Sequence, residues 1–256
     1  MKNYAVPHKI RIIHTFSENG TVYQISDHFY EKDPQKNTRD LSFKREGMPC
    51  FYLHSSVYLD PHIVEQPIYL IPQEIINKWS QMSPINNALV MGCAGCTIPR
   101  FLVLSFPECK VVGVELSATQ IDIAKKYFYV KEYDERFRIV QGDARKYFHV
   151  EPNELFDLIY IDLYEENRIV DCVFSPQFIE AQLKHLSFRA LLVINLLDVL
   201  QNDVIKLVSQ YSKFSWCSGS VVINEGRQFL IVSNTDRNWF RDFRKNLNDM
   251  LCMYEF

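Results

Sequence analysis

The sequence predicts a Rossmann-like α/β fold, in which helices cover both faces of a mostly parallel β-sheet. After Asn87, short apolar runs alternate with amphipathic stretches whose apolar residues recur at helical spacing. That alternation favours parallel strands joined by crossover helices. Before His54, short extended runs are instead separated by turn signals. We therefore expect a small N-terminal β domain with its following loop over residues 1–73, and a large α/β domain over 74–256.

The N-terminal region has the pattern of an antiparallel sheet. An apolar run over 10–16 precedes Asn19-Gly20, a dipeptide that favours a two-residue hairpin turn. Three more extended segments follow before a proline-containing loop. Four strands are too few to be comfortably stable alone, so we interpret them as an appendage of the large domain. Residues 74–82 predict a connecting helix.

The large domain begins with strands and helices that have clear boundaries. Thr97 opens a helix with Pro99 in its first turn, and Ser117 caps the next helix. Near the C-terminus, a turn-like segment over 224–226 predicts an antiparallel hairpin at the sheet edge. The seven expected strands are ALVMG, KVVGVEL, FRIVQGD, FDLIYID, ALLVINL, FSWCSGSV and QFLIVSN. The last segment, over 238–256, predicts an amphipathic helix whose packing face carries Trp239, Phe243, Leu247 and Leu251.

Composition argues against several classes of protein. The chain is 47% apolar, with a net charge of −3, so it lacks the basic field expected of a nucleic-acid-binding protein. No apolar stretch approaches the roughly 20 residues of a membrane-spanning helix. Seven scattered cysteines suggest free thiols in a reducing compartment. These features predict a cytoplasmic protein with neither a nucleic-acid nor a membrane partner.

Three signals follow successive predicted strands, at the edge where open α/β sheets bind ligands. The first is the small-residue turn 92–96, which leads into a helix N-terminus. The second is Glu115, which could accept hydrogen bonds from both hydroxyls of a ribose. The third is Gly142-Asp143-Ala144, where an adenine amino group could be read. Together they predict an adenosine-binding site, although Glu115 alone could equally cap the helix that Ser117 opens.

A fourth carboxylate, Asp162, ends the next apolar strand and would lie beside the reactive end of a bound nucleoside. The alternative is that residues 162–166 form only a polar surface turn. Cys93 and Cys96 make a CxxC pair, but no second pair of ligands is spaced for zinc, and we predict no metal site. His54 and His62 are more simply structural, although either could line a pocket for a second substrate.

The segment from Ala88 to Leu197 resembles the spermidine/spermine synthase family, within the class I methyltransferase superfamily. The resemblance is to its divergent, spermidine-synthase-like branch, and the small N-terminal β region matches that family in placement and type. The runs that carry the resemblance are ALVMGCAGCTIPRFL, VVGVELSATQIDIAKKYF, FRIVQGDARKYF, FDLIYIDLYEEN and SPQFIEAQLKHLSFRALLVINL.

The resemblance implies an aminopropyltransferase that uses decarboxylated S-adenosylmethionine and a polyamine such as putrescine, releases methylthioadenosine, and forms a homodimer. It implies that Asp162 takes the proton of the attacking amine and that Tyr69 is the active-site tyrosine. The cofactor-binding residues that it implies are Gly92, Cys93, Gly95, Glu115, Leu116, Asp143, Ala144 and Asp162. The substrate-binding residues that it implies are Glu65, Gln66, Tyr69, Tyr164 and Glu165.

Two departures from the family pattern leave a second function open. Typical members carry an acidic residue in the glycine loop, where this chain has Gly95, and Glu65-Gln66 replaces a strongly acidic pair. A loop without that acid could accept the carboxylate of intact S-adenosylmethionine, with S-adenosylhomocysteine as product. Methyl transfer to an unknown small acceptor is therefore the alternative enzymatic function. A non-catalytic adenosine-binding protein is the third hypothesis.

Overall fold

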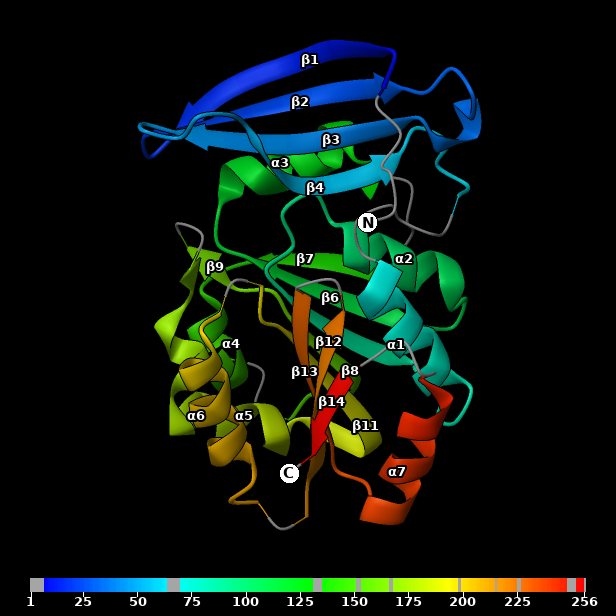
Figure 1. Cartoon of the computed structure of the whole chain (residues 1–256), viewed down its shortest axis with the longest axis vertical. Helices are drawn as coiled ribbons and strands as arrows, with labels where there is room; N and C mark the ends of the chain where they lie inside the picture. The colour runs from blue at the N-terminus through cyan, green and yellow to red at the C-terminus, as the bar shows by residue number, and fades with distance from the viewer. Residues whose placement is uncertain are drawn as a thin grey trace.

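A computed structural model gives the fold as two stacked domains, with a small β-sheet above a larger α/β unit (Figure 1). The structure describes residues 7–63, 70–130, 135–150, 153–165, 168–197, 199–214, 216–224, 227–247 and 252–255.

The small domain is a four-stranded antiparallel sheet, as predicted, and its strands lie in chain order. The turn between the first two strands consists of Asn19 and Gly20 alone, since Glu18 pairs with Thr21. Both turn residues have positive φ angles, 49° and 75°, which Asn and Gly tolerate best. The strands are β1 (Lys9–Glu18), β2 (Thr21–Phe29), β3 (Thr38–Arg45) and β4 (Tyr52–Tyr58), with the short helix η1 (Pro34–Lys36) between β2 and β3.

The large domain contains an eight-stranded sheet in the order β14-β12-β13-β11-β8-β5-β6-β7. The five strands from β11 to β7 run parallel, and the three at the other edge are antiparallel. These strands are β5 (Asn87–Met91), β6 (Lys110–Glu115), β7 (Phe137–Gln141), β8 (Phe156–Ile161), β11 (Leu186–Asn195), β12 (Ser218–Asn224), β13 (Arg227–Ser233) and β14 (Cys252–Glu255). The helices are α1 (Leu70–Ser80), α2 (Thr97–Ser105), α3 (Ala118–Tyr127), α4 (Ala144–Val150), η3 (Asp171–Phe174), α5 (Pro176–Lys184), α6 (Gln201–Tyr211) and α7 (Arg237–Asn246).

The predicted parallel sheet with its antiparallel edge hairpin is confirmed, but the C-terminal helix is shorter than the sequence predicted. Helix α7 ends at Asn246, and residues 252–255 form an eighth strand along β12. Without β14, strand β12 would be the edge of the sheet and its backbone N–H and C=O groups on that side would be unpaired. Residues 252–255 pair with those groups. Leu251 lies outside the described residues. The connecting helix α1 begins at Leu70, four residues before the predicted start.

Helices cover both faces of the large sheet, and each face buries its own apolar cluster (Figure 1). Helices α1, α2 and α7 pack on one face, and α4, α5 and α6 on the other. Trp79 of α1 anchors the first cluster, since its ring meets those of Trp239 and Phe243 edge-on at 4.8 and 4.7 Å. The predicted packing role of the Trp239 and Phe243 face is therefore confirmed.

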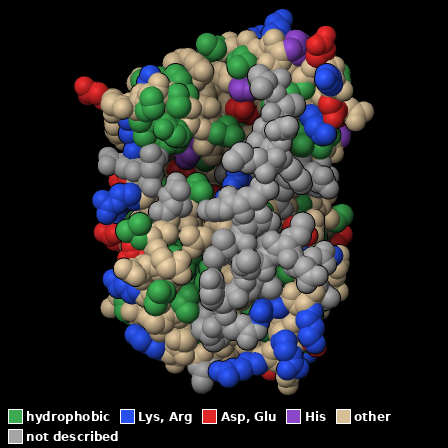
Figure 2. Space-filling model, in the orientation of Figure 1, with side chains coloured by type: hydrophobic (Ala, Val, Ile, Leu, Met, Phe, Trp, Pro, Cys, Tyr) green, Lys and Arg blue, Asp and Glu red, His purple; other side chains and the backbone are tan. Residues whose placement is uncertain are grey.

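The molecular surface is mixed in charge. Figure 2 shows Lys and Arg side chains at the lower end of the molecule, which includes the region where Figure 1 draws α7. That helix exposes Arg237, Arg241 and Lys245. Within the described ranges, no helix combines the length and apolarity needed to cross a membrane.

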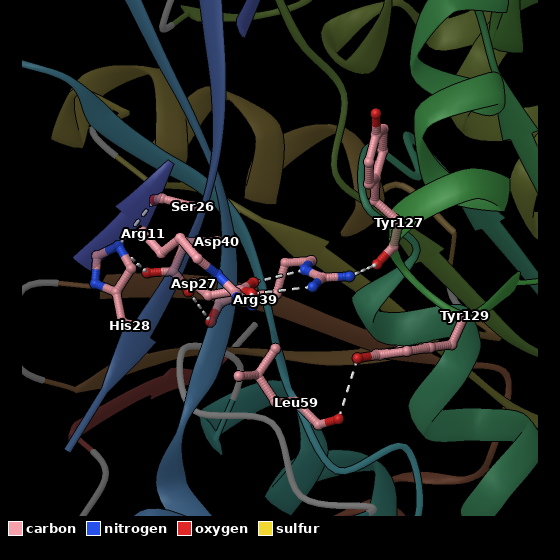
Figure 3. A network of polar contacts seen from close by, with 10 residues as sticks. Arg11, Ser26, Asp27, His28, Arg39, Asp40, Leu59, Tyr127 and Tyr129 are labelled. Atoms are coloured by element: carbon pink, nitrogen blue, oxygen red, sulfur yellow. Dashed lines mark hydrogen bonds and ion pairs between the residues drawn. The ribbon is translucent and has the colours of Figure 1, made fainter. Parts of the chain in front are cut away.

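The small sheet packs on the C-terminal end of α3 through an apolar cluster and a hydrogen bond from Arg39. Ile25, Leu41 and Val57 of the sheet pack against Ile123 and Phe128. Beside them, Arg39 donates to Asp27 at 2.7 Å and to the backbone carbonyl of Tyr127 at 3.0 Å (Figure 3). The Arg39 guanidinium therefore ties the sheet to the large domain.

Loss of Arg39 would also leave the buried Asp27 carboxylate without its main partner. The Asp27 side chain is fully buried and also accepts a hydrogen bond from Arg11 at 2.7 Å. Burial by itself would raise the pKa of the Asp27 carboxyl, but hydrogen bonds from Arg39 and Arg11 hold it below its usual value.

We expect Arg39→Ala to destabilise the protein by about 3 kcal/mol, because it leaves a buried carboxylate without its main partner. Arg11→Ala is the matched control: the Arg11 side chain is 58% exposed, so its loss should cost less than about 1 kcal/mol. Urea unfolding of the two variants measures the difference, and equal losses would show that Arg39 does not hold the domains together.

Candidate functional site

The fold brings the predicted signals to one edge of the large sheet. Strands β8, β5, β6 and β7 are neighbours and parallel, so the residues that follow them meet at their carboxyl ends. Backbone hydrogen bonds fix this register: Asp162 N–H donates to Met91, Gly92 N–H to Val114, and Gly142 N–H to Glu115. The turn after β5, Glu115, Asp143 and Asp162 therefore line a single edge.

Gly92 allows two of these segments to touch. Its φ angle is +84°, and a Cβ placed there would lie 2.1 Å from the backbone oxygen of Asp162. Only glycine combines that backbone conformation with such a close approach. The turn after β5 can therefore lie directly on the end of β8, as a cradle for a ligand requires.

Glu115 holds the glycine-rich turn in shape. One carboxylate oxygen accepts the N–H groups of Cys93 and Ala94 at 3.0 and 3.1 Å, and the other accepts that of Ser117 at 3.0 Å. Glu115 thus also supports the start of α3, which was the alternative role expected from the sequence. Ser117 caps α3 as predicted, since its hydroxyl accepts the Gln120 N–H.

Asp143 lies at the same edge but is paired with a neighbour. Arg145 donates to both of its oxygens, at 2.9 and 2.8 Å, and this contact holds the pKa of the Asp143 carboxyl below its usual value. Ala144 is buried at the start of α4, whereas the Leu116 side chain is 66% exposed. Leu116 therefore offers an exposed apolar surface at this edge, whereas the Asp143 carboxylate is engaged by Arg145.

Asp162 has the environment of a proton acceptor. Its carboxylate accepts a hydrogen bond from Asn195 Nδ2 at 2.9 Å. Burial raises the pKa of the Asp162 carboxyl to about 6, and the Asn195 hydrogen bond partly opposes that shift. A carboxyl with a pKa near 6 is ionised at neutral pH and is a stronger base than an ordinary aspartate.

The segment after Asp162 folds back on itself instead of forming a simple turn. Tyr164–Glu165 (β9) pairs with Arg168–Ile169 (β10). The Tyr164 hydroxyl donates to the backbone oxygens of Asn195 and Leu197, so it ties this hairpin to the end of β11. Glu165 is exposed. The predicted substrate residues Tyr164 and Glu165 thus lie in the hairpin that follows Asp162, and the Tyr164 hydroxyl holds that hairpin in place.

Three predicted residues cannot be placed, because Glu65, Gln66 and Tyr69 lie outside the described residues. Their roles stay predictions.

Gly95 faces the small domain. A Cβ at this position would lie 2.7 Å from Ser55 Oγ of β4 and 3.1 Å from the Phe128 ring. Ser55 in turn hydrogen-bonds Thr97 at 2.6 Å, and both side chains are buried. The place where the resemblance implies an acidic side chain is therefore filled by Ser55 of the small sheet and by the Phe128 ring.

The CxxC pair is part of the core. Cys93 and Cys96 are both buried, and a Cβ on Gly113 would lie 2.7 Å from Cys93 Sγ. The hydrogen bond that the protonated Cys93 thiol donates to Cys96, together with burial, raises the pKa of that thiol well above its usual value. Among the described residues, His, Cys, Asp and Glu side chains form no group of three that could hold a metal ion.

Sequence reasoning missed Asn195 and the contribution of the small sheet. Asn195 ends the apolar strand next to β8, and a polar residue at that edge was a usable signal. Tyr23, His54 and Gln120 also gather near Glu115, but they come from three separate elements. No spacing in the sequence predicts that meeting.

The chain is similar to curated enzymes over its central segment. It is 27% identical over 109 residues to a polyamine aminopropyltransferase from Chromobacterium violaceum, covering 43% of this chain and 41% of the relative. It is 31% identical over 98 residues to thiocyanate methyltransferase 1 from Brassica oleracea, covering 38% of each chain. The matched segment thus spans about two fifths of these relatives. No family model matches.

Solved structures extend the similarity to almost the whole fold. A probable spermidine synthase from Corynebacterium glutamicum superposes with a TM-score of 0.71 at 15% identity, over 96% of this chain and 91% of its own. Human methyltransferase-like protein 13, in complex with SAH, gives 0.56 at 14% identity, over 69% of this chain and 86% of its own. The comparisons support a spermidine-synthase-like family within the methyltransferase fold, which confirms the predicted fold class and the stated resemblance.

We expect Gly92→Ala to destabilise the protein by at least about 2 kcal/mol, because alanine is strained at positive φ and its methyl group would clash with Asp162. Gly142→Ala is the control, since a Cβ there meets no atom within 4 Å. Thermal unfolding compares the two variants, and equal midpoints would contradict the proposed close approach.

The raised pKa of Asp162 predicts a pH-dependent gain in stability for Asp162→Asn. The fold favours the neutral carboxyl, so the native state is fully stable below the unfolded value of 3.8 and loses stability as pH rises through about 6. Asparagine mimics the neutral form, and the gain should reach about 1–3 kcal/mol at pH 8 and shrink at pH 4. Urea unfolding at both pH values measures it. The exposed Asp122→Asn should show no such trend, and a constant difference for Asp162→Asn would contradict the expectation.

Proposed function

We propose that this protein is a spermidine-synthase-like transferase that moves an aminopropyl group from decarboxylated S-adenosylmethionine to a polyamine such as putrescine. The observation that carries the proposal is Asp162, a carboxylate with a raised pKa beside a glycine-rich turn that Glu115 holds in place. A second support is the small N-terminal sheet, because the similarity to the Corynebacterium glutamicum protein spans both domains.

The residues at the sheet edge suit an adenosyl group. Gly92 lets the turn after β5 lie against the backbone of Asp162, so the turn would hold a bound nucleoside close to that carboxylate. Glu115 would receive the ribose hydroxyls, and Leu116 with Ala144 would border the adenine. The sulfonium of the bound nucleoside would supply an electrophilic carbon and a neutral thioether leaving group.

Asp162 would prepare the attacking amine. A primary amine has a pKa near 10, so it is protonated at neutral pH and lacks the lone pair that attacks carbon. The ionised Asp162 carboxylate would orient the ammonium and accept one proton. Asn195 would keep Asp162 pointing in one direction, and Tyr164 would hold the adjoining hairpin. Positioning of the amine and the carbon in line would provide most of the acceleration.

Methyl transfer is the second candidate, and Gly95 is the observation that favours it. The contact of Gly95 with Ser55 excludes an acidic side chain that could bind the free amino group of the aminopropyl arm. Intact S-adenosylmethionine carries a carboxylate of its own, which an acidic side chain in this loop would repel. With Gly95 in that place, the repulsion is absent. Methylthioadenosine as product would identify aminopropyl transfer, and S-adenosylhomocysteine would identify methyl transfer.

The proposal also extends to partners and location. The acceptor would be a small amine or polyamine, which suits the ionised Asp162 carboxylate. We propose a cytoplasmic homodimer by the same family resemblance, and light scattering of the purified chain would test the dimer.

Incubation with decarboxylated S-adenosylmethionine and putrescine should release methylthioadenosine, detectable by chromatography. Asp162→Asn should lower kcat/KM by about 10²–10⁴-fold, since general-base catalysis commonly contributes that much. For the intact enzyme, kcat/KM should rise with pH through about 6 as Asp162 ionises. Asp122→Asn, on the exposed side of α3, should retain full activity. Release of S-adenosylhomocysteine from intact S-adenosylmethionine would favour the second candidate, and neither product with any common amine would overturn both.

A further inference from the structure

A strained bulge lies at the amino ends of the parallel strands, at the end of the sheet opposite to the candidate site. In the pairing of β11 with β8, residues 187–190 stand opposite Asp157 alone. Phe188 in this bulge is 82% exposed. Arg189 has a φ angle of 57°, in the left-handed region that is unfavourable for a residue with a Cβ. The bulge therefore holds a costly backbone conformation and leaves an aromatic ring in solvent.

Side chains from two other segments hold the bulge in shape. Asn234, which follows β13, donates to the Ser187 carbonyl at 2.6 Å and accepts the Ala190 N–H at 3.0 Å. The Ser83 hydroxyl donates to the Arg189 carbonyl at 3.1 Å. Both ends of the bulge and its strained residue are thus fixed, and Phe188 is presented by rigid backbone.

The exposed ring stands among arginines. The Arg189 guanidinium lies 5.1 Å from the centroid of the Phe188 ring and 5.6 Å from that of Trp239 on α7. Helix α7 adds Arg237 and Arg241, which are exposed and one turn apart. Among the residues that the structure describes, none of these three guanidinium groups pairs with a carboxylate. They belong to the part of the chain where Figure 2 shows basic side chains at the lower end of the molecule.

Two more apolar side chains are exposed at the same end of the sheet. Leu155 directly precedes β8 and is 52% exposed, and Trp216 lies just before β12 and is 49% exposed. Strands β8, β11 and β12 all begin at this end, and the pairing of Ser233 with both β11 and β12 aligns them. Phe188 is therefore the most exposed of three apolar groups on one basic surface, and a surface of that kind marks an interaction site.

We propose that this end of the large sheet docks on an anionic lipid bilayer, with Phe188 inserted between headgroups and Arg189, Arg237 and Arg241 on their phosphates. Cations around an apolar side chain are the combination that binds a protein to the surface of an anionic bilayer. The inference goes beyond the proposed reaction, because the candidate site lies at the opposite edge of the sheet.

A bilayer fits this surface better than a nucleic acid does. Nucleic-acid binding takes its affinity from many phosphate contacts along a basic stripe, and three arginines on a chain of net charge −3 do not make one. Phe188 protrudes, so its partner must supply the apolar volume, and a bilayer does so without a preformed pocket. Because the net charge averages this basic end with the rest of the chain, composition alone predicted no membrane partner.

The test is co-sedimentation of the intact chain with two kinds of vesicle: phosphatidylcholine alone, and equal parts of phosphatidylcholine and phosphatidylglycerol. The variant Phe188→Ser removes the ring, and the double variant Arg237→Gln/Arg241→Gln removes two cations. Because these side chains are exposed, the thermal midpoints of both variants should equal that of the unmodified chain.

Matched controls come from the small-domain end of the molecule. Ile10→Ser removes an apolar side chain that is 55% exposed on β1. Lys32→Gln/Lys125→Gln removes two exposed cations, with the same change in net charge as the arginine variant. All four variants should still release methylthioadenosine, so a failure of docking is distinguishable from a failure of the proposed function.

We expect the chain to sediment with the mixed vesicles and to stay in solution with phosphatidylcholine alone. Phe188→Ser should weaken the partition about tenfold, through loss of a buried aromatic group. The arginine variant should weaken it about 25-fold, at roughly fivefold per charge, and the controls should bind like the unmodified chain. Absence of binding, or equal losses in the variants and their controls, would overturn the proposal. Binding of oligouridylate or polyglutamate with the same dependence on Phe188 would assign the surface to a soluble polyanion and would overturn the bilayer as its partner.

Discussion

The carboxylate of Glu115 is the constraint on which the site depends. It accepts three backbone N–H groups, two from the glycine-rich turn after β5 and one from the start of α3. Charge-assisted hydrogen bonds of this kind are stronger than those between neutral groups. One side chain thus fixes the turn that would cradle a nucleoside and the helix beside it. A change at Glu115 would alter the shape of the site as well as its charge.

A second constraint joins the two domains. The fully buried Asp27 pairs with Arg39, whose guanidinium also reaches the carbonyl of Tyr127 on α3. Because α3 starts beside Glu115 and ends under the small sheet, the same helix links the interdomain contact to the candidate site. The small sheet is therefore part of the framework of that site, and its strand β4 contributes Ser55, which packs against Gly95.

Ser55 also explains the most informative departure from the family pattern. The resemblance implies an acid where this chain has Gly95, and a side chain at Gly95 would overlap Ser55. The two residues form a matched pair, since the glycine lets β4 approach and the serine hydroxyl then bonds Thr97. Substrate choice would accordingly depend on groups outside the glycine-rich turn, such as Asp162 and its support from Asn195.

The sequence by itself determined the order of strands and helices, the Asn19-Gly20 turn and the placing of Glu115, Asp143 and Asp162 at strand ends, because those features follow from local periodicity and turn chemistry. The C-terminal strand was missed, since residues 252–255 become a strand only by pairing with the edge of β12. Tertiary structure alone decided that Asn195 supports Asp162 and that Ser55 of the small sheet packs against Gly95. Such contacts join residues far apart in the chain, and their geometry depends on how the two domains pack rather than on any spacing in the sequence.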